Sequence, residues 1–254
     1  MKIAITRGVS PSIERCELTH LERETININL ANEQHSQYEE CLTELGCEVR
    51  SLPAEPDLPD SVFVEDTAIV VEELAVITRP GAESRRPEVS GIAEVLGEYR
   101  RLAYIVEPGT IDGGDVLVLD HDVYIGQSGR TNEEGVRQVR AMLTPLGYTV
   151  TGLPVKACLH LKSAVGRVAP DTILIIRQWV NSTVFGGMKF IDVDPAEPGA
   201  AGALLIEDTV IYPARFERTR ERLDRAGIKT VVVNLSELAK AEAGVTCSSI
   251  VFEA

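Results

Sequence analysis

Five segments of similar length repeat along the chain. Each begins with a small or acidic residue in a turn and continues into an apolar run, and the starting residues are Asp66, Asp115, Ser163, Ala203 and Cys247. Their successive separations are 49, 48, 40 and 44 residues. Self-similarity at a period of roughly 20–50 residues is typical of units that stack or close around an axis. We therefore expect five units around one axis, the alternative being five unrelated hairpins whose similar spacing is a coincidence.

Three of these units read as β-hairpins. Residues 64–79, 114–126 and 202–213 each contain an apolar strand, a short polar turn and a second strand. The unit that starts at Cys247 contains one strand only, whereas the chain opens with the apolar strand Lys2–Ile5. We expect these two ends to pair and close the ring, because closure removes exposed strand edges.

Helical periodicity alternates with the hairpins, so we expect a mixed α/β fold. The spacing of apolar residues and the capping residues predict helices over 29–45, 89–98, 132–146, 215–226 and 235–242. Most of them lead into a strand, such as 48–52 or 230–233. No long stretch of Pro, Ser or charged residues marks a linker, which favours a single domain spanning residues 1–254.

The chain is acidic, with a formal net charge of −14. This balance argues against nucleic acid or an anionic membrane as a partner, because both require clustered Lys and Arg. No apolar run approaches the roughly 18 residues that span a bilayer, and the start Met1–Arg7 meets charge too early for a signal peptide. We expect a cytoplasmic protein.

The five cysteines predict neither a disulfide framework nor a zinc site. They are odd in number and scattered, with no C-x-x-C or His-x-x-x-His spacing. Cys41 and Cys47 lie at a predicted helix end that Gly46 caps, so we expect both to pack in the core, whereas Cys16 has no assignment. Reduced thiols fit this pattern best.

Cys247 is the candidate nucleophile. A thiol attacks efficiently near neutral pH only if its surroundings favour the thiolate. His160 and the carboxylates of the turn 111–115 are distant in sequence, so a site would have to be assembled by folding. Because equivalent positions of the repeat meet at one mouth of a ring, we expect Asp66, Asp112, His160 and Cys247 to share a pocket.

Several motifs together carry a family resemblance. They are Asp60–Asp66, Thr78–Arg86, Ile111–Asp115, Gly129–Asn132, Leu159–Lys162 and Val245–Cys247. Their combination, in this order and over nearly the whole chain, resembles dimethylarginine dimethylaminohydrolase of the guanidino-group-modifying or pentein superfamily. The resemblance implies a five-bladed α/β propeller, in agreement with the repeat.

The resemblance also implies an activity and a set of catalytic residues. The reaction is hydrolysis of Nω,Nω-dimethyl-L-arginine, and of the monomethyl form, to L-citrulline and the corresponding amine, without a metal or an organic cofactor. Cys247 would attack the guanidinium carbon, and His160, oriented by Asp112, would protonate the departing amine. His160 would then activate the water that hydrolyses the thiouronium intermediate.

Glu65 and Asp66 are the candidate contacts for the guanidinium of the substrate. Carboxylates bind this planar cation through charge-assisted hydrogen bonds of matched geometry. The bound cation also favours a neighbouring thiolate, so we expect the substrate itself to activate Cys247.

The amino-acid end of the substrate has its own candidates. By the resemblance, Arg85 and Arg130 hold the carboxylate, and Asp60 takes the ammonium group together with the backbone carbonyls of Leu18 and Ala241. The segment around Leu18 lacks periodicity, which is typical of a lid over a pocket.

Two positions depart from the family pattern. Asp112 stands where many bacterial relatives carry Glu, but it still supplies a carboxylate for His160. Gly202–Ala203 replaces a common Asn–Cys pair, and we expect an effect on pocket support or substrate choice. Asp115, next to the predicted site, is expected to cap the turn at Gly113–Gly114.

Two other functions remain open from the sequence. A deiminase acting on free arginine or another guanidine could use the same residues, since one or two methyl groups change discrimination by only about 1–3 kcal/mol. A catalytically silent propeller that binds a macromolecular partner is the other alternative, although Cys247, His160 and Asp112 are all present. A homodimer is expected by family analogy alone.

Overall fold

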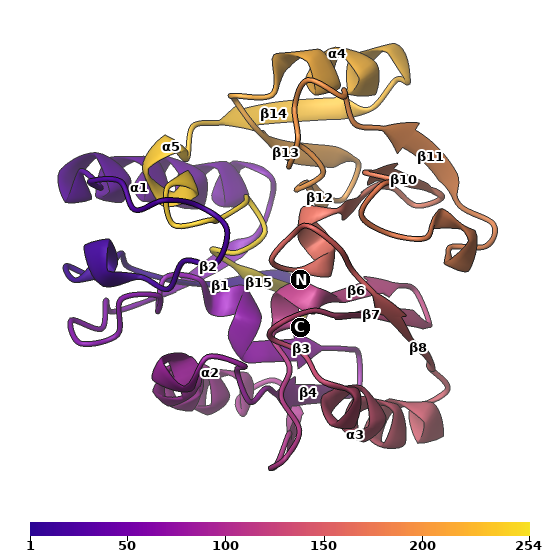
Figure 1. The fold of residues 1–254 in the computed structure, drawn as a ribbon. Coiled ribbons are helices and arrows are strands. Elements are labelled where there is room, and N and C mark those ends of the chain that lie inside the picture. Colours follow the sequence, from indigo (N-terminus) through magenta and orange to yellow (C-terminus); the bar gives the residue numbers. More distant parts are fainter.

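The computed structural model describes residues 1–254 as a ring of five three-stranded sheets. In each sheet the middle strand pairs antiparallel with one neighbour and parallel with the other. The longer helices lie on the outside of the ring (Figure 1). The predicted five-bladed α/β propeller is confirmed.

Fifteen short strands and five α-helices form this ring. The sheets consist of β15 (Ile250–Glu253), β1 (Lys2–Arg7) and β2 (Glu48–Leu52); β3 (Ala68–Val70), β4 (Leu74–Ile77) and β5 (Arg101–Tyr104); β6 (Val116–Leu119), β7 (Asp122–Gln127) and β8 (Thr149–Pro154); β9 (Val165–Ala169), β10 (Thr172–Ile175) and β11 (Lys189–Asp192); and β12 (Leu204–Ile206), β13 (Thr209–Pro213) and β14 (Lys229–Val233). The helices are α1 (Ile28–Glu44), α2 (Val89–Leu96), α3 (Glu133–Leu143), α4 (Glu217–Arg225) and α5 (Ser236–Ala239).

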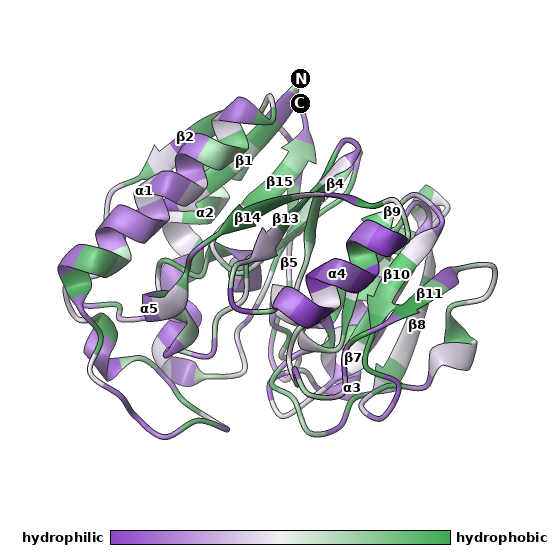
Figure 2. Ribbon diagram, turned by 90° about the horizontal axis from the view of Figure 1, so that it is seen from above, coloured by the Kyte–Doolittle hydropathy of each residue, from purple (hydrophilic) through white to green (hydrophobic).

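The first and last strands close the ring, as the sequence predicted. β1 pairs antiparallel with β15, in a register that runs from Lys2 opposite Glu253 to Ile5 opposite Ile250. Both termini therefore lie at the same end of the molecule (Figure 2). The pairing completes the one sheet whose strands come from both ends of the chain, so no blade lacks a strand.

Parallel neighbours need a crossover connection, and helices supply most of these. In four sheets α1, α2, α3 and α4 connect the middle strand to its parallel neighbour. Between β10 and β11 the connection contains only the 3-10 turn Ser182–Val184. The fourth blade is therefore the one without an α-helical layer.

Four of the predicted helices agree with the structure, and the fifth prediction was too long. The helix predicted over 132–146 is α3 followed by the 3-10 turn Thr144–Leu146. The helix predicted over 235–242 is only α5, because Glu242 adopts a positive φ of 60° that ends helical geometry. Because the helix ends early, the residues that follow α5 reach a pocket at the mouth of the ring.

The hydrophobic core is divided among the blades instead of lying at the centre of the ring. The largest cluster surrounds Tyr38 and Leu42 of α1 and also contains Cys16, Cys41 and Cys47. The expected packing role of Cys41 and Cys47 is confirmed, and all five cysteines are free. Full burial of a side chain such as Leu42 contributes about 1.5–3 kcal/mol.

The first strands of the blades surround a cavity on the axis, with a volume of ≈ 330 Å³. Residues of β3, β6, β9, β12 and β15 line this axial cavity. The strands β3, β6 and β9 follow directly, or after a single residue, on the 3-10 turns Val64–Thr67, Gly113–Asp115 and Leu161–Ser163. These turns contact one another; the first contains Glu65 and Asp66, and Asp112 and His160 directly precede the other two. None of the helices is long and apolar enough to cross a bilayer.

Candidate active site

One pocket at the mouth of the ring collects residues from well-separated parts of the sequence. It is lined by Glu17, Asp60, Phe63, Asp66, Arg85, Arg130, Leu159, His160, Ser163, Ala241, Glu242, Ala243 and Cys247. The structure thus brings together Cys247, His160, Asp60, Asp66, Arg85, Arg130 and Ala241. Asp112, Glu65 and Leu18 do not line this pocket.

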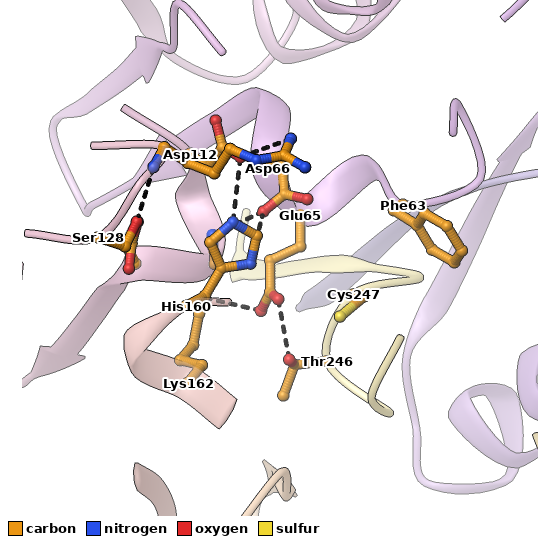
Figure 3. A network of polar contacts seen from close by, with 12 residues as sticks. Phe63, Glu65, Asp66, Asp112, Ser128, His160, Lys162, Thr246 and Cys247 are labelled. Carbon is orange, nitrogen blue, oxygen red and sulfur yellow. Dashed lines mark hydrogen bonds and ion pairs between the residues drawn. The ribbon is translucent and has the colours of Figure 1, made fainter. Parts of the chain in front are cut away.

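His160 lies between two carboxylates (Figure 3). Its Nε2 is 3.0 Å from Oδ2 of Asp112, and its Nδ1 is 3.8 Å from Oδ1 of Asp66. Burial by itself lowers the pKa of His160, but Asp66 and the hydrogen bond to Asp112 outweigh burial and raise the pKa to about 9. At neutral pH the imidazole is therefore protonated, as a general acid must be.

Asp112 stands behind His160, fully buried. Its Oδ1 accepts a hydrogen bond from the backbone N–H of Gly81 at 2.9 Å, while Oδ2 faces His160. A side chain at Gly81 would not fit, because a Cβ there would lie 2.4 Å from the carbonyl oxygen of Arg130. The close approach of these two segments fixes the carboxylate that orients the imidazole.

The turn Gly113–Asp115 differs from its predicted role. Asp115 does not cap its own turn with its side chain; it accepts hydrogen bonds from the backbone N–H of Leu161 at 2.9 Å and from the hydroxyls of Ser128 and Thr131. A Cβ at Gly114 would lie 2.6 Å from Nδ1 of His160. Glycine at this position therefore makes room for the imidazole. Asp115 in turn holds the backbone of Leu161, the residue that follows His160.

Cys247 lies in the loop between α5 and β15. The backbone N–H of Gly244 donates to Sγ at 3.2 Å, and the carbonyl of Cys247 accepts from the N–H of Glu65. Burial first, and then Glu65 and Asp66, raise the pKa of the Cys247 thiol to about 12. Without a cationic ligand the thiol is therefore protonated, which agrees with the expectation that substrate activates it.

The hydroxyl of Tyr38 holds this loop from the side of α1. It donates to the carbonyl of Val245 at 2.8 Å and shares a hydrogen bond with the hydroxyl of Ser249 at 2.7 Å. These two contacts bracket Cys247 in the sequence. Nothing in the sequence pattern marked Tyr38, because an apolar-face tyrosine in a helix is read as core.

Glu65 and Asp66 are consecutive but face different cavities. Oδ2 of Asp66 is 2.6 Å from Nη1 of Arg85, and Oδ1 accepts from the backbone N–H of Gly114. Burial alone would raise the pKa of Asp66, yet His160 and Arg85 lower it to about 2. Asp66 is thus an ionised carboxylate at the pocket wall.

The contact of Glu65 with the guanidinium stays a prediction. Its carboxylate is 2.7 Å from Nζ of Lys162 and accepts from the hydroxyl of Thr246 at 2.8 Å (Figure 3). All three residues line the axial cavity and not the pocket. The ion pair with Lys162 draws the Glu65 side chain to that side, although its charge still raises the pKa of the Cys247 thiol after burial.

The residues predicted for the amino-acid end of the substrate surround one side of the pocket. Arg85 is buried and already bonded to Asp66, to Glu88 and to the carbonyls of Asp60 and Phe63. Arg130 is freer, with Nη2 3.2 Å from the hydroxyl of Thr19.

Asp60 and Ala241 line the same side, whereas Leu18 lies just outside. The Asp60 carboxylate accepts from the backbone N–H of Glu17 at 3.1 Å. The Leu18 side chain packs against the apolar cluster around α1, and its neighbour Glu17 lines the pocket instead. The sequence did not indicate Glu242, which was assigned to the predicted helix 235–242.

Comparison with known proteins assigns the family. A family model described as "N,N dimethylarginine dimethylhydrolase, eukaryotic" matches residues 14–183. The N(G),N(G)-dimethylarginine dimethylaminohydrolase of Streptomyces coelicolor is 41% identical over 250 residues, which cover 98% of this chain and 96% of that protein. The chain belongs to the dimethylarginine dimethylaminohydrolase family. The protein of the same name from Pseudomonas aeruginosa is 36% identical over 224 residues, covering 87% of this chain and 88% of that one.

Solved structures of the dimethylarginine dimethylaminohydrolase family share this fold. A mutant of the Pseudomonas aeruginosa enzyme complexed with citrulline superposes with a TM-score of 0.94 at 33% identity, covering 98% of each chain. The superposed region covers all five blades.

The second departure from the dimethylarginine dimethylaminohydrolase pattern lies away from the pocket. Ala203 lines the axial cavity, and a Cβ placed on Gly202 would meet no atom within 4 Å. Neither residue lines the active-site pocket. Neither residue therefore has a contact with the pocket through which the expected effect on pocket support could act.

Three side chains of the site could in principle ligate a metal. Ligand atoms of Asp66, Asp112 and His160 lie within 4.8 Å of one another. Each is already engaged, Asp66 with Arg85 and Asp112 with His160. The expectation of a reaction without metal or cofactor stays a prediction.

Proposed function

We propose that this chain hydrolyses Nω,Nω-dimethyl-L-arginine, and the monomethyl form, to L-citrulline and the corresponding amine. The observation that carries the proposal is an imidazole placed between Asp112 and Asp66, in the same pocket as the Cys247 thiol. Membership of the dimethylarginine dimethylaminohydrolase family supports the same reaction. The substrate is accordingly a small guanidino amino acid.

Binding of the guanidinium prepares the nucleophile. The cation lies against the ionised Asp66 and offsets the negative charges of Glu65 and Asp66, which together with burial, the larger cause, raise the pKa of Cys247 to about 12. The thiol releases its proton to water and the thiolate forms beside the guanidinium carbon. Because the cation is the substrate, the reactive thiolate forms mainly in the complex.

The first half of the reaction expels the amine. Sγ of Cys247 bonds to the guanidinium carbon and gives a tetrahedral adduct. His160 gives its proton to the dimethylamine nitrogen as the carbon–nitrogen bond breaks. The products are dimethylamine, a neutral His160 and an S-linked thiouronium.

The second half regenerates the enzyme. Neutral His160 takes a proton from a water molecule, whose oxygen bonds to the thiouronium carbon. Collapse of this second adduct breaks the carbon–sulfur bond, the hydroxyl proton passes to water, and citrulline and the thiolate are released. Asp112 keeps the imidazole in one orientation through both halves, so a single group acts as acid and then as base.

The amino-acid end is held by charged groups on the opposite side of the pocket. Arg130 and Arg85 receive the substrate carboxylate, with Arg130 as the principal contact because Arg85 is largely bonded within the protein. Asp60 and the carbonyls of Ala241 and Leu18 receive the ammonium. The distance between the two charged ends selects a free amino acid with an arginine-length side chain.

We further propose that residues 1–254 act as one catalytic domain in the cytoplasm. Because β1 pairs with β15, both ends of the chain are needed to complete one blade. Five unpaired cysteines support a reducing compartment. A homodimer stays a prediction.

A substrate panel tests the reaction. Dimethylarginine, monomethylarginine, arginine and agmatine are compared for citrulline or carbamoyl product, with Cys247→Ser as the control. We expect the two methylated arginines to be turned over fastest and the Cys247→Ser variant to be inactive. Faster turnover of arginine would favour a deiminase, and no turnover of any guanidine would favour the silent binder.

A further inference from the structure

The active-site pocket is too small for an amino acid as it stands. Its volume of ≈ 30 Å³ is enough for one or two water molecules. Pockets for small molecules are commonly about 300–1,000 Å³. An arginine derivative therefore enters only after some part of the wall moves.

The segment Glu17–Leu21, here called the covering segment, borders the pocket through Glu17 and is largely exposed. The side chains of Thr19, His20 and Leu21 are exposed, Leu21 at 50%. Exposed segments with little apolar packing open at low free-energy cost. The covering segment is therefore held mainly by hydrogen bonds to residues that line the pocket.

One carboxylate provides most of these hydrogen bonds. Glu242 accepts the backbone N–H groups of Thr19 at 3.0 Å, His20 at 2.5 Å and Leu21 at 2.6 Å. Hydrogen bonds to an ionised acceptor are roughly twice as strong as neutral ones. The remaining contacts are hydrogen bonds from Arg130 to the Thr19 hydroxyl, from the Glu17 N–H to Asp60 and from the Ser84 hydroxyl to the Glu17 carboxylate. Leu18 adds packing against the apolar cluster around α1.

The backbone at Glu242 is set for this contact. Its φ of 60° is in the left-handed region, which a residue with a side chain adopts only when its surroundings require it. Glu242 stands between Ala241 and Ala243, which also line the pocket, and five residues before Cys247. One strained residue thus connects the covering segment to the loop that carries the nucleophile.

We propose that Glu242 is a positioning residue that holds the covering segment closed over the bound substrate. Release of its three backbone partners opens the pocket, and their return after binding places Glu17 and Thr19 against Asp60 and Arg130. Glu242 acts through the segment and takes no part in the bond changes. The kinetic consequence rests on the function proposed above, whereas the effect on segment opening does not.

Hydrogen–deuterium exchange tests the opening directly. The variants are Glu242→Ala, Glu242→Gln, which keeps one neutral acceptor oxygen, and the control Glu22→Gln, which removes an exposed charge from the same region. We expect the amides of residues 19–21 to exchange roughly 10–100 times faster in Glu242→Ala, with a smaller increase in Glu242→Gln and none in Glu22→Gln. The amides of β1 serve as the internal reference for global unfolding.

Unchanged exchange at residues 19–21 in Glu242→Ala would overturn the proposal, and so would faster exchange there only in proportion to β1. Added citrulline should slow exchange at these amides in the unaltered protein. In Glu242→Ala we expect that protection by citrulline to be largely lost.

Steady-state kinetics with dimethylarginine provide the second readout. A loosened covering segment weakens binding more than chemistry, so Glu242→Ala should raise KM by about tenfold or more with a smaller change in kcat. If kcat instead fell by that same factor while KM stayed unchanged, the result would contradict a positioning role. If the unaltered chain turns over no guanidine but the exchange result holds, the proposed function fails and the role of Glu242 in closure stands.

Discussion

The axial cavity and the active-site pocket are built from the same turns, yet their chemistry differs. The axial cavity is the larger, at ≈ 330 Å³, and twelve of its 19 lining residues are hydrophobic. The pocket, at ≈ 30 Å³, has five hydrophobic residues among 13 and contains the cysteine, the histidine and both predicted arginine contacts. Volume therefore does not locate the reaction in this molecule; the convergence of charged groups does.

Consecutive residues of three segments face opposite sides of this boundary. Toward the axial cavity lie Glu65, Lys162 and Thr246, and toward the pocket lie Asp66, Ser163 and Cys247. In the 3-10 turns the cause is geometric, because three residues per turn place neighbours about 120° apart. Residues adjacent in sequence thus divide into three that line the axial cavity and three that line the active-site pocket.

Replacing His160 should produce the largest loss on the pocket side. His160→Gln removes the proton donor of the first half and the base of the second, so kcat should fall by about 10²–10⁴-fold. The matched change on the axial side is Lys162→Gln, which should change kcat by much less. Comparable losses in the two variants would remove the functional distinction between the two cavities.

The neighbours Glu65 and Asp66 give the next largest contrast. Asp66→Asn should lower kcat/KM for dimethylarginine by roughly 100-fold, because it removes an ionised contact for the cation and a partner of His160. Glu65→Gln should leave KM nearly unchanged but lower the free energy of unfolding by about 1–3 kcal/mol, since Lys162 loses its charged partner. Kinetics and urea unfolding of both variants measure the two effects, and a KM rise in Glu65→Gln larger than in Asp66→Asn would restore Glu65 as the guanidinium contact.

Titration of His160 should appear in both activity and stability. Its folded-state pKa, about 9, lies above the unfolded value near 6.5, so the protonated form stabilises the folded chain fully below pH 6.5. That contribution is lost as pH rises from about 6.5 to 9, and kcat/KM should fall above pH 9 as the acid is lost. Asp112→Asn removes a charge that raises the pKa of His160, so kcat/KM should begin to fall at a lower pH. An unchanged pH profile would mean that Asp112 does not control the protonation of His160.

Replacing Tyr38 should have a smaller effect on activity, transmitted through the loop that carries Cys247. Tyr38→Phe removes one hydroxyl and leaves the carbonyl of Val245 and the hydroxyl of Ser249 without this partner. We expect a loss of about 1–3 kcal/mol in unfolding free energy and a moderate fall in kcat. Tyr104→Phe, at an exposed position, is the control and should be silent in both measurements.

The smallest effect is expected at the departure from the family pattern. Restoring Asn at Gly202 and Cys at Ala203 changes residues near the axial cavity only, so kcat and KM for dimethylarginine should stay within about twofold. A larger change in KM would mean that the axial side reaches the substrate after all.

The repeat and the ring closure could be predicted because they depend on local patterns. Apolar hairpins recur at a near-constant period, and the single strands at the two ends have no other partner in that scheme. The meeting of Asp66, His160 and Cys247 followed from equivalent positions in such a ring. These inferences need periodicity and no side-chain detail.

The remaining features depend on side-chain direction, which a pattern does not carry. Glu65 was grouped with Asp66, but the ion pair with Lys162, which is 97 positions away in sequence, turns it to the other cavity. Glu242 was assigned to a helix, but its positive φ ends the helical geometry after α5, and its carboxylate accepts from the backbone of residues 19–21. Asp115 was expected to cap its own turn, and its partner Leu161 belongs to the next blade.

Acid quenching during turnover, followed by peptide mass mapping, shows directly whether Cys247 is the nucleophile. With dimethylarginine, we expect a thiouronium adduct on the peptide that contains Cys247 and on no other cysteine, and no adduct in Cys247→Ser. Turnover with no adduct at Cys247, or with the adduct on Cys158, would rule out Cys247 as the attacking thiol.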